Sequence, residues 1–235
     1  FGYPGGAILN VYDELYKHQN EIRHVLTSHE QGASHAADGY ARSTGKVGVC
    51  FATSGPGATN LVTGIATAYM DSIPMVALTG QVATKLIGKD AFQEVDITGA
   101  TLPFTKHSYL IKDGLDIPRV VNEAFHIANT GRPGPVLIDF PMDLLKKEFD
   151  YPDEDEDVNI RGYKLMGKAN ESQVKKVAEA IKGAKKPVIL AGGGVVISDA
   201  TNEFRKFVKE TDIPVVSTMM GIGILPSDNP RYYGM

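Results

Sequence analysis

The 235-residue sequence has a single cysteine, no tryptophan and no apolar run long enough to cross a membrane. Cys50 has no second cysteine to pair with in the chain, which fits a reducing compartment, and we expect a cytoplasmic location. A membrane helix needs about 20 mostly apolar residues. The formal net charge of −4 offers no basic surface to nucleic acid or to anionic lipid. The sequence therefore predicts a globular protein that binds neither nucleic acid nor membrane.

The two ends of the sequence lack the features of domain ends. Phe1 to Pro4 is typical of the exit from a strand that would precede Phe1, and residues 231–235 lead into no closing element. We therefore expect the chain to be a fragment of a longer protein.

Short apolar runs rich in β-branched residues alternate with segments of helical spacing. The predicted strands are 22–26, 47–52, 75–78 and 136–140, and the predicted helices are 7–18, 31–43, 58–69 and 117–129. Several strands are apolar almost throughout, as expected where helices cover both faces of a parallel sheet. Residues 1–148 are therefore predicted to form an α/β domain with a parallel sheet.

An acidic run interrupts this alternation. Six of the eight residues from Asp150 to Asp157 are acidic. Adjacent acids on an extended chain point in different directions, so we predict a solvated linker over 149–160 and not a metal site. The alternation then resumes, with helices predicted at 171–182 and 199–210 and strands at 187–190 and 215–216. Residues 161–235 are therefore predicted to begin a second, Rossmann-like domain that is truncated.

Glu30 lies at the predicted start of a helix. Ser28 to Gln31 has the form of a capping box, and an acid in the first turn is favoured by the helix dipole. Such an acid needs no function. However, the helix that follows is dominated by small residues, which allow the close approach of a partner helix or of a flat ligand.

Two further glycine-rich turns, 3–7 and 53–60, also precede predicted helices. Glycine lets a ligand approach the main chain, and a helix N-terminus offers free amides. Residues 53–60 match neither the dinucleotide-binding nor the P-loop pattern, and each turn alone could be a simple tight turn. Three turns that leave one parallel sheet are, however, predicted to meet in one crevice. Residues 80–82 and 90–94 would add polar groups there.

Six strings, taken in order, resemble the catalytic subunit of acetolactate synthase (acetohydroxyacid synthase), a thiamine-diphosphate-dependent enzyme. They are Tyr-Pro-Gly-Gly-Ala, His-Glu-Gln-Gly-Ala, Asp-Gly-Tyr-Ala-Arg, Thr-Ser-Gly-Pro-Gly-Ala-Thr-Asn, Asp-Ala-Phe-Gln-Glu and Gly-Arg-Pro-Gly-Pro-Val-Leu-Ile-Asp-Phe-Pro. Several are shared with the wider thiamine-diphosphate superfamily, which includes benzoylformate decarboxylase and glyoxylate carboligase. The run from Ile87 to Glu94 points more narrowly to acetolactate synthase.

The resemblance implies that residues 1–148 bind the pyrimidine ring of thiamine diphosphate and that Glu30 hydrogen-bonds a ring nitrogen to activate the cofactor. It implies the condensation of two pyruvates, or of pyruvate and 2-oxobutyrate, with loss of carbon dioxide, in branched-chain amino-acid biosynthesis (valine, isoleucine, leucine). The cofactor-binding residues implied beside Glu30 are Ser54, Gly55, Ser72 and Gln93. The substrate-side residues implied are Gly6, Phe92, Gln93 and Lys106.

The second domain would be the central, FAD-binding domain of this family. The residues implied to contact the flavin are Arg132, Gly193, Thr218, Met219, Met220 and Gly221. The Mg²⁺ site that holds the diphosphate would lie beyond these 235 residues, so no metal ligand is assigned and the fragment alone is expected to be inactive. The resemblance also implies a homodimer or tetramer with the active site at the subunit interface, and it allows a small regulatory subunit as a further partner.

The sequence departs from the family pattern at two places. Ala83-Thr84-Lys85 stands where many members carry proline and arginine, and Met142 stands where a lysine is common. Both positions line the entrance that inhibitors use, so inhibitor sensitivity is not implied. Two alternatives stay open: another thiamine-diphosphate-dependent 2-oxoacid decarboxylase or carboligase, or a non-catalytic nucleotide-binding module.

Overall fold

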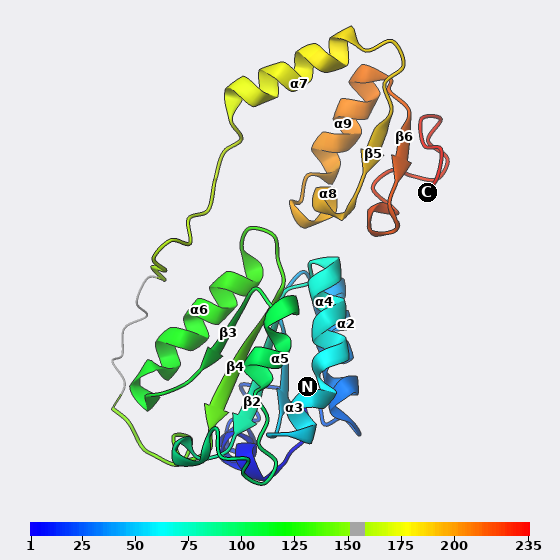
Figure 1. Ribbon diagram of the computed structural model, residues 1–235. Coiled ribbons are helices and arrows are strands. Elements are labelled where there is room, and N and C mark those ends of the chain that lie inside the picture. The colour runs from blue at the N-terminus through cyan, green and yellow to red at the C-terminus, as the bar shows by residue number, and fades with distance from the viewer. Residues whose placement is uncertain (151–157) are drawn as a thin grey trace. The chain divides into compact units, whose positions relative to one another are not determined.

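The computed structural model describes residues 1–150 and 158–235. These residues divide into two compact units, Phe1–Leu165 and Met166–Met235 (Figure 1). The first unit thus extends to Leu165, beyond the predicted linker. The acids from Asp153 to Asp157 lie outside the described residues, and the linker stays a prediction. No helix in the described ranges is both long enough and apolar enough to cross a bilayer.

The first unit is built on a parallel sheet. Its four strands are β1 (Gly48–Ala52), β2 (Met75–Gln81), β3 (His107–Leu110) and β4 (Pro135–Pro141). Their order in the sheet is β1-β2-β4-β3, and every pair is parallel. All residues of β4 are buried, whereas β3 is an edge strand that is only partly buried. The parallel α/β fold is confirmed, but the sequence analysis missed β3 because its half-polar sequence lacks an apolar run.

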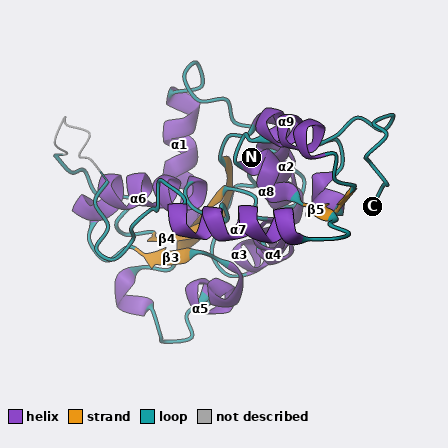
Figure 2. Ribbon diagram, turned by 90° about the horizontal axis from the view of Figure 1, so that it is seen from above, coloured by secondary structure: helices purple, strands orange, loops and turns teal. Residues whose placement is uncertain are grey.

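Helices cover both faces of this sheet (Figures 1 and 2). One face packs against α2 (Glu30–Thr44), α3 (Pro56–Asn60), α4 (Val62–Asp71) and α5 (Ile97–Thr101), and the other packs against α6 (Ile117–Asn129). Successive strand residues point to opposite faces. Met75 and Ala77 therefore join the core beneath α2 and α4, whereas Val76 joins the core beneath α6.

Three local predictions are corrected by the structure. The predicted strand 22–26 is not a strand: only Leu26 forms an isolated bridge, with Gly2. Gly2 donates its main-chain N–H to the Val25 carbonyl and accepts the N–H of Thr27, and these two bonds are too few for a ladder. The predicted helix 58–69 is divided at Leu61 into α3 and α4, and the predicted helix 7–18 consists of a 3-10 turn, η1 (Gly6–Ile8), followed by α1 (Leu9–Lys17).

The second unit is smaller and less completely packed. It contains α7 (Glu171–Gly183), β5 (Ile189–Ala191), α8 (Gly193–Ile197), α9 (Thr201–Thr211), β6 (Val215–Ser217) and the 3-10 turn η5 (Met219–Gly221). Strands β5 and β6 pair in parallel. Its core cluster consists of the buried side chains of Ala191, Val208, Val215, Ile224 and Leu225, and Ile213 is buried as well. Helix α7 buries none of its residues. Among the described residues, the first unit also contains three 3-10 turns, η2 (Thr84–Leu86), η3 (Leu102–Phe104) and η4 (Gly114–Asp116).

Candidate active site

Two glycine-rich turns meet at the carboxyl end of strand β1. The main-chain N–H of Ala7 donates a hydrogen bond to Thr53 Oγ1, at 3.2 Å. A Cβ on Gly5 would lie only 2.4 Å from Thr53 Cγ2, so no larger residue fits without a shift of the turn. The turn 3–7 therefore packs directly against the turn 53–60, and the predicted meeting of these two turns is observed.

Glu30 is a buried acid beside the turn 53–60. Glu30 is the first residue of α2, and it is 8% exposed. Asn60 Nδ2 donates to Glu30 Oε2 at 2.9 Å, whereas no hydrogen bond reaches Oε1 from the described residues. A Cβ on Gly57 would stand 3.2 Å from Oε1. Glycine at this position therefore keeps one carboxylate oxygen open, which suits a ligand that hydrogen-bonds there.

The cap of α2 differs from the predicted capping box. The N-cap residue is His29, which is extended (φ −160°), and its Nδ1 accepts the N–H of Gln31 at 3.0 Å. Ser28 lies one residue too early, because the helix begins at Glu30. The His29 imidazole therefore caps the helix in place of the predicted Ser28 hydroxyl. Glu30 still lies in the first turn, as predicted, where the helix dipole favours a carboxylate.

The loop that carries Phe92 and Gln93 covers the other side of the turn 53–60. The Glu94 carboxylate folds this loop by accepting the main-chain N–H groups of Gly88 and of Ala91, the latter at 2.9 Å, and these bonds lower the pKa of Glu94. Gln93 is left-handed (φ 56°). A Cβ on Gly55 would lie 2.5 Å from the carbonyl oxygen of Gln93. The loop therefore rests on the glycine of the turn.

The structure brings most of the predicted thiamine-side residues to one place. Glu30 and Gln93 border the turn 53–60, which contains Gly55 and the buried Ser54. Gly6 begins η1 on the adjoining turn, with no atom within 4 Å of the position of a Cβ. Phe92 is 88% exposed. The turn 53–60 thus lies between the buried carboxylate of Glu30 and the exposed loop of Phe92 and Gln93.

Ser72 and Lys106 lie at the opposite, amino end of the sheet. Ser72 ends α4, a helix of ten residues that is about 15 Å long and has the Glu30 partner Asn60 before its start. Lys106 Nζ donates to the carbonyls of Ile127 and Thr130 at the end of α6, where it complements the helix dipole. The structure does not bring either residue to Glu30, and their predicted roles stay predictions.

Arg132 also lies at the amino end of the sheet. Its Nε donates to Ser72 Oγ at 2.7 Å. Arg132 belongs to the first unit, whereas the other residues predicted to contact a flavin belong to the second. Its predicted flavin contact stays a prediction.

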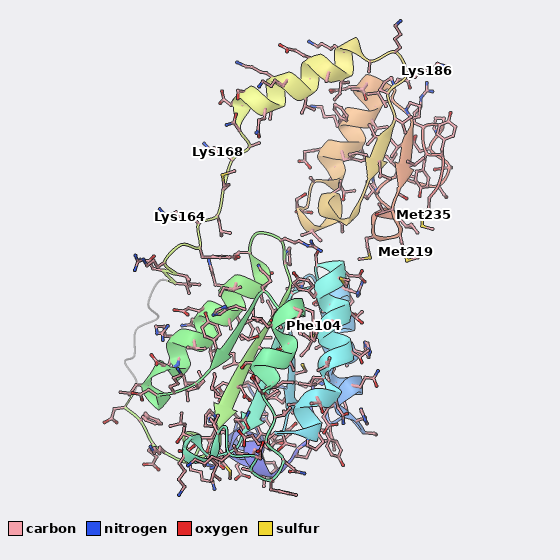
Figure 3. The ribbon with its side chains drawn as sticks, viewed as in Figure 1. Phe104, Lys164, Lys168, Lys186, Met219 and Met235 are labelled. Carbon is pink, nitrogen blue, oxygen red and sulfur yellow. The ribbon has the colours of Figure 1, made fainter. Side chains whose placement is uncertain are left out.

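The second unit gathers the remaining predicted flavin residues around one turn. The Thr218 N–H donates to the Ala191 carbonyl at 2.9 Å. A Cβ on Gly221 would lie 2.4 Å from that carbonyl oxygen, and a Cβ on Gly193 would lie 3.0 Å from the Cβ of Met220. The side chain of Met219 is 70% exposed beside this turn (Figure 3). An exposed, apolar edge next to close-packed main chain fits a flat ring.

Sequence reasoning missed Asn60 and a buried polar network around Asp139. Asp139 is 1% exposed, in strand β4. Burial raises the pKa of its carboxyl to about 7, although hydrogen bonds from Thr79 and Gln81 act in the opposite direction. The available signal was an acid inside the apolar run 136–140. In the described parts of the chain, no three His, Cys, Asp or Glu side chains are placed to hold a metal ion.

The fold and this crevice define a class of protein. Residues 1–100 match the model of the thiamine pyrophosphate enzyme, N-terminal TPP binding domain, and residues 174–235 match the thiamine pyrophosphate enzyme, central domain. The chain belongs to the thiamine pyrophosphate enzymes.

Within this class the chain is similar to acetolactate synthases. It is 52% identical to the acetolactate synthase of Arthrospira platensis, over 100% of this chain and 41% of that protein. It is 54% identical to the acetolactate synthase of Mycobacterium leprae, over 100% and 37%. It is also 54% identical to the probable acetolactate synthase large subunit of Methanocaldococcus jannaschii, over 100% and 40%. The resemblance predicted from the motifs is confirmed. The chain spans about two fifths of the length of these relatives.

Proposed function

We propose that this chain is part of the catalytic subunit of an acetolactate synthase, which joins two pyruvates, or pyruvate and 2-oxobutyrate, with loss of carbon dioxide in branched-chain amino-acid biosynthesis. The observation that carries the proposal is the buried Glu30, with one oxygen open to the crevice, in a chain similar over its whole length to acetolactate synthases.

Glu30 is the residue that would hold a proton at the cofactor. Asn60 donates to Oε2, so Oε1 is the oxygen that would hydrogen-bond the pyrimidine ring. Gly57 keeps the approach to Oε1 free, since a side chain there would meet the carboxylate. Thiamine diphosphate, when bound, supplies the carbon chemistry, and the protein supplies orientation and proton placement.

Gln93 and Phe92 would act on the substrate side of the same site. Both are exposed in the described structure, on a loop whose main chain is fixed against Gly55. The exposed ring of Phe92 is available to a neighbouring chain, and we propose that a second subunit contacts it in a homodimer or tetramer. The Mg²⁺ and diphosphate would be held by residues outside this chain. The proposal retains the predicted cytoplasmic location.

We extend the proposal to FAD at the second unit. The supporting features are the close contact of Gly193 with Met220, the close contact of Gly221 with Ala191, and the exposed Met219 beside them. Main chain packed this closely leaves a shallow surface on which a flat ring could lie. The flavin would have no redox part in the net reaction.

The proposal is tested on the full-length protein with pyruvate, thiamine diphosphate and Mg²⁺. The expected product is acetolactate, with flavin absorbance near one equivalent per chain. Acetolactate from a colourless protein would favour a flavin-free synthase, and acetaldehyde in its place would favour a 2-oxoacid decarboxylase. A protein that fails to bind thiamine diphosphate would contradict the assignment and favour a non-catalytic module.

A further inference from the structure

Gln81 joins the end of a central strand to the loop that carries Gln93. It is the last residue of β2 and is 3% exposed. Its Nε2 donates to the Val95 carbonyl and to Asp139 Oδ2, both at 2.8 Å, and its Oε1 accepts the N–H of Val82 at 2.8 Å. The two main-chain partners fix which end of the amide is nitrogen. Every polar atom of this side chain is therefore committed.

Asp139 orients Gln81 from the neighbouring strand. Its Oδ2 accepts from Gln81, and its Oδ1 accepts the Thr79 hydroxyl at 2.7 Å. Thr79 is paired with Asp139 in the register of β2 and β4. A carboxyl group in this buried place is unfavourable unless its oxygens are hydrogen-bonded. Both oxygens have partners here, so the acid serves to hold the side chains of Thr79 and Gln81.

The loop itself has few ties to the sheet. Glu94 closes residues 88–94 on themselves through main-chain N–H groups of the same loop. In the described part of the chain, the bond from Gln81 to Val95 is the one hydrogen bond that joins residues 85–96 to a strand. Val95 lies two residues after Gln93. Val95 also packs against the core beneath α2 and α4. The bond from Gln81 and this packing together fix the main chain two residues after Gln93.

We propose that Gln81, oriented by Asp139, is the positioning residue that holds the Gln93 loop at the reacting centre. The inference rests on the proposed function, because it takes Gln93 to face the substrate. Gln81 itself touches neither cofactor nor substrate in this proposal. Its effect is on the geometry of the loop, and it is therefore expected in turnover more than in cofactor affinity.

The test uses the full-length protein and two substitutions of Gln81. Gln81→Leu keeps the approximate volume and removes both donated hydrogen bonds, and Gln81→Asn keeps the amide but is too short to reach Val95 and Asp139 together. Thr105→Val is the matched control, because the Thr105 hydroxyl is also buried and bonded to main chain but lies before β3, away from the loop. Asp139→Asn is the conservative variant, since its amide can still accept from Gln81 and donate to Thr79.

Three measurements are made on each variant: the rate of tryptic cleavage after Lys85 and Lys89, kcat with pyruvate, and the Kd of thiamine diphosphate. Both Gln81 variants should be cleaved about three- to tenfold faster, as expected for the loss of a hydrogen bond. Their kcat should fall roughly 10- to 100-fold, as misplacement near a reacting centre implies. The Kd should change little. Thr105→Val and Asp139→Asn should behave as the wild type in cleavage and kcat.

Wild-type cleavage rates and wild-type kcat in both Gln81 variants would overturn the inference. Equal loss of kcat in Thr105→Val would also overturn it, because the effect would then be general destabilisation. A wild-type protein that makes no acetolactate would refute the proposed function instead. The cleavage rates would still report whether Gln81 holds the loop, so the two failures can be told apart.

Discussion

The two units use glycine-rich turns after parallel strands in different ways. In the first unit, a glycine clears space beside a side chain that is held by a hydrogen bond, as Gly57 does for the Glu30 carboxylate. In the second unit, glycines let main chain meet main chain, as Gly221 does at the Ala191 carbonyl. The same sequence signal thus leads to a site with an acid and to a site with none.

Among the described residues, the core of the first unit is also larger than the core of the second unit. Strands β2 and β4 are covered on both faces, and the buried acids of the described residues, Glu30, Asp38 and Asp139, all belong to the first unit. In the second unit, Leu190 is 68% exposed within β5. A well-packed core can hold a buried carboxyl group in place. A sparsely packed core cannot, so a ligand there would be recognised by the shape of the surface. Proton chemistry is therefore expected in the first unit alone.

The largest effect is expected for Glu30→Gln in the full-length protein. Loss of a positioned acid–base group should lower kcat by roughly 10²- to 10⁴-fold. The matched control is Glu203→Gln, because Glu203 also lies in the first turn of a helix but is exposed, in the second unit. Turnover of acetolactate formation is the measurement. Equal rates for the two variants would mean that Glu30 is only a helix-start acid.

The next effect is a pH dependence of stability confined to the first unit. The folded-state pKa of Asp139 is raised to about 7, above its ordinary value of 3.8. The unfolded chain therefore releases this proton first, and stability should fall as pH rises from about 4 to about 7, by at most roughly 4 kcal/mol. Asp139→Asn should remove this part of the fall. Urea unfolding at pH 5 and pH 8, followed by circular dichroism, measures the difference between the two proteins. A parallel fall in both would contradict the prediction.

Gly221→Ala should reveal how far the second unit depends on close main-chain contact. The new Cβ would lie 2.4 Å from the Ala191 carbonyl oxygen, and such overpacking costs about 1–3 kcal/mol. We expect loss of bound flavin, measured by absorbance per chain, with thiamine diphosphate still bound. Gly194→Ala is the control, because no atom lies within 4 Å of its Cβ position. Full flavin content in Gly221→Ala would mean that the second unit does not depend on close main-chain contact at Gly221.

The smallest effect is expected at helix N-caps. Asn170 Oδ1 accepts the N–H groups of Ser172 and Gln173 at the start of α7. Since α7 buries no residue, its helicity depends on this cap, and Asn170→Ala should cost about 1 kcal/mol. His29→Ala removes the corresponding bond from α2, which buries six residues, and should lose less helix. Hydrogen exchange of the two first turns compares them, and equal losses would mean that burial does not protect α2.

Much of the fold could be predicted from the sequence. The apolar runs located β1, β2 and β4, and the helix 117–129 agrees with α6 at both ends. The edge strand β3 was missed, because edge strands lack the apolar pattern that burial on two faces produces. The segment 22–26 was wrong for the converse reason: its apolar residues are there, but only Gly2 pairs with it.

The candidate site was predictable only where local sequence determines it. The convergence of the turns near Glu30 followed from the rule that parallel strands end at one edge. The hydrogen bond from Asn60 to Glu30 and the one from Gln81 to Val95 did not follow from it, because each joins a side chain to a residue elsewhere in the sequence. Motif resemblance assigned Ser72 to the cofactor side and Lys106 to the substrate side. In this structure both lie at the amino end of the sheet, and those roles stay predictions.

The strand order β1-β2-β4-β3 has a consequence for synthesis on the ribosome. Strand β4 (Pro135–Pro141) is the last of the four in the sequence, yet it pairs with both β2 and β3. Until it has left the exit tunnel, β3 has no neighbour and β2 has one open edge. The emerging chain therefore carries an open edge of β2 and an unpaired β3, which are exposed to aggregation, until β4 has left the tunnel. The sheet gains its full set of strand pairs only when β4 is available. The strands that lie beside Glu30 and Gln81 are therefore complete only late in synthesis.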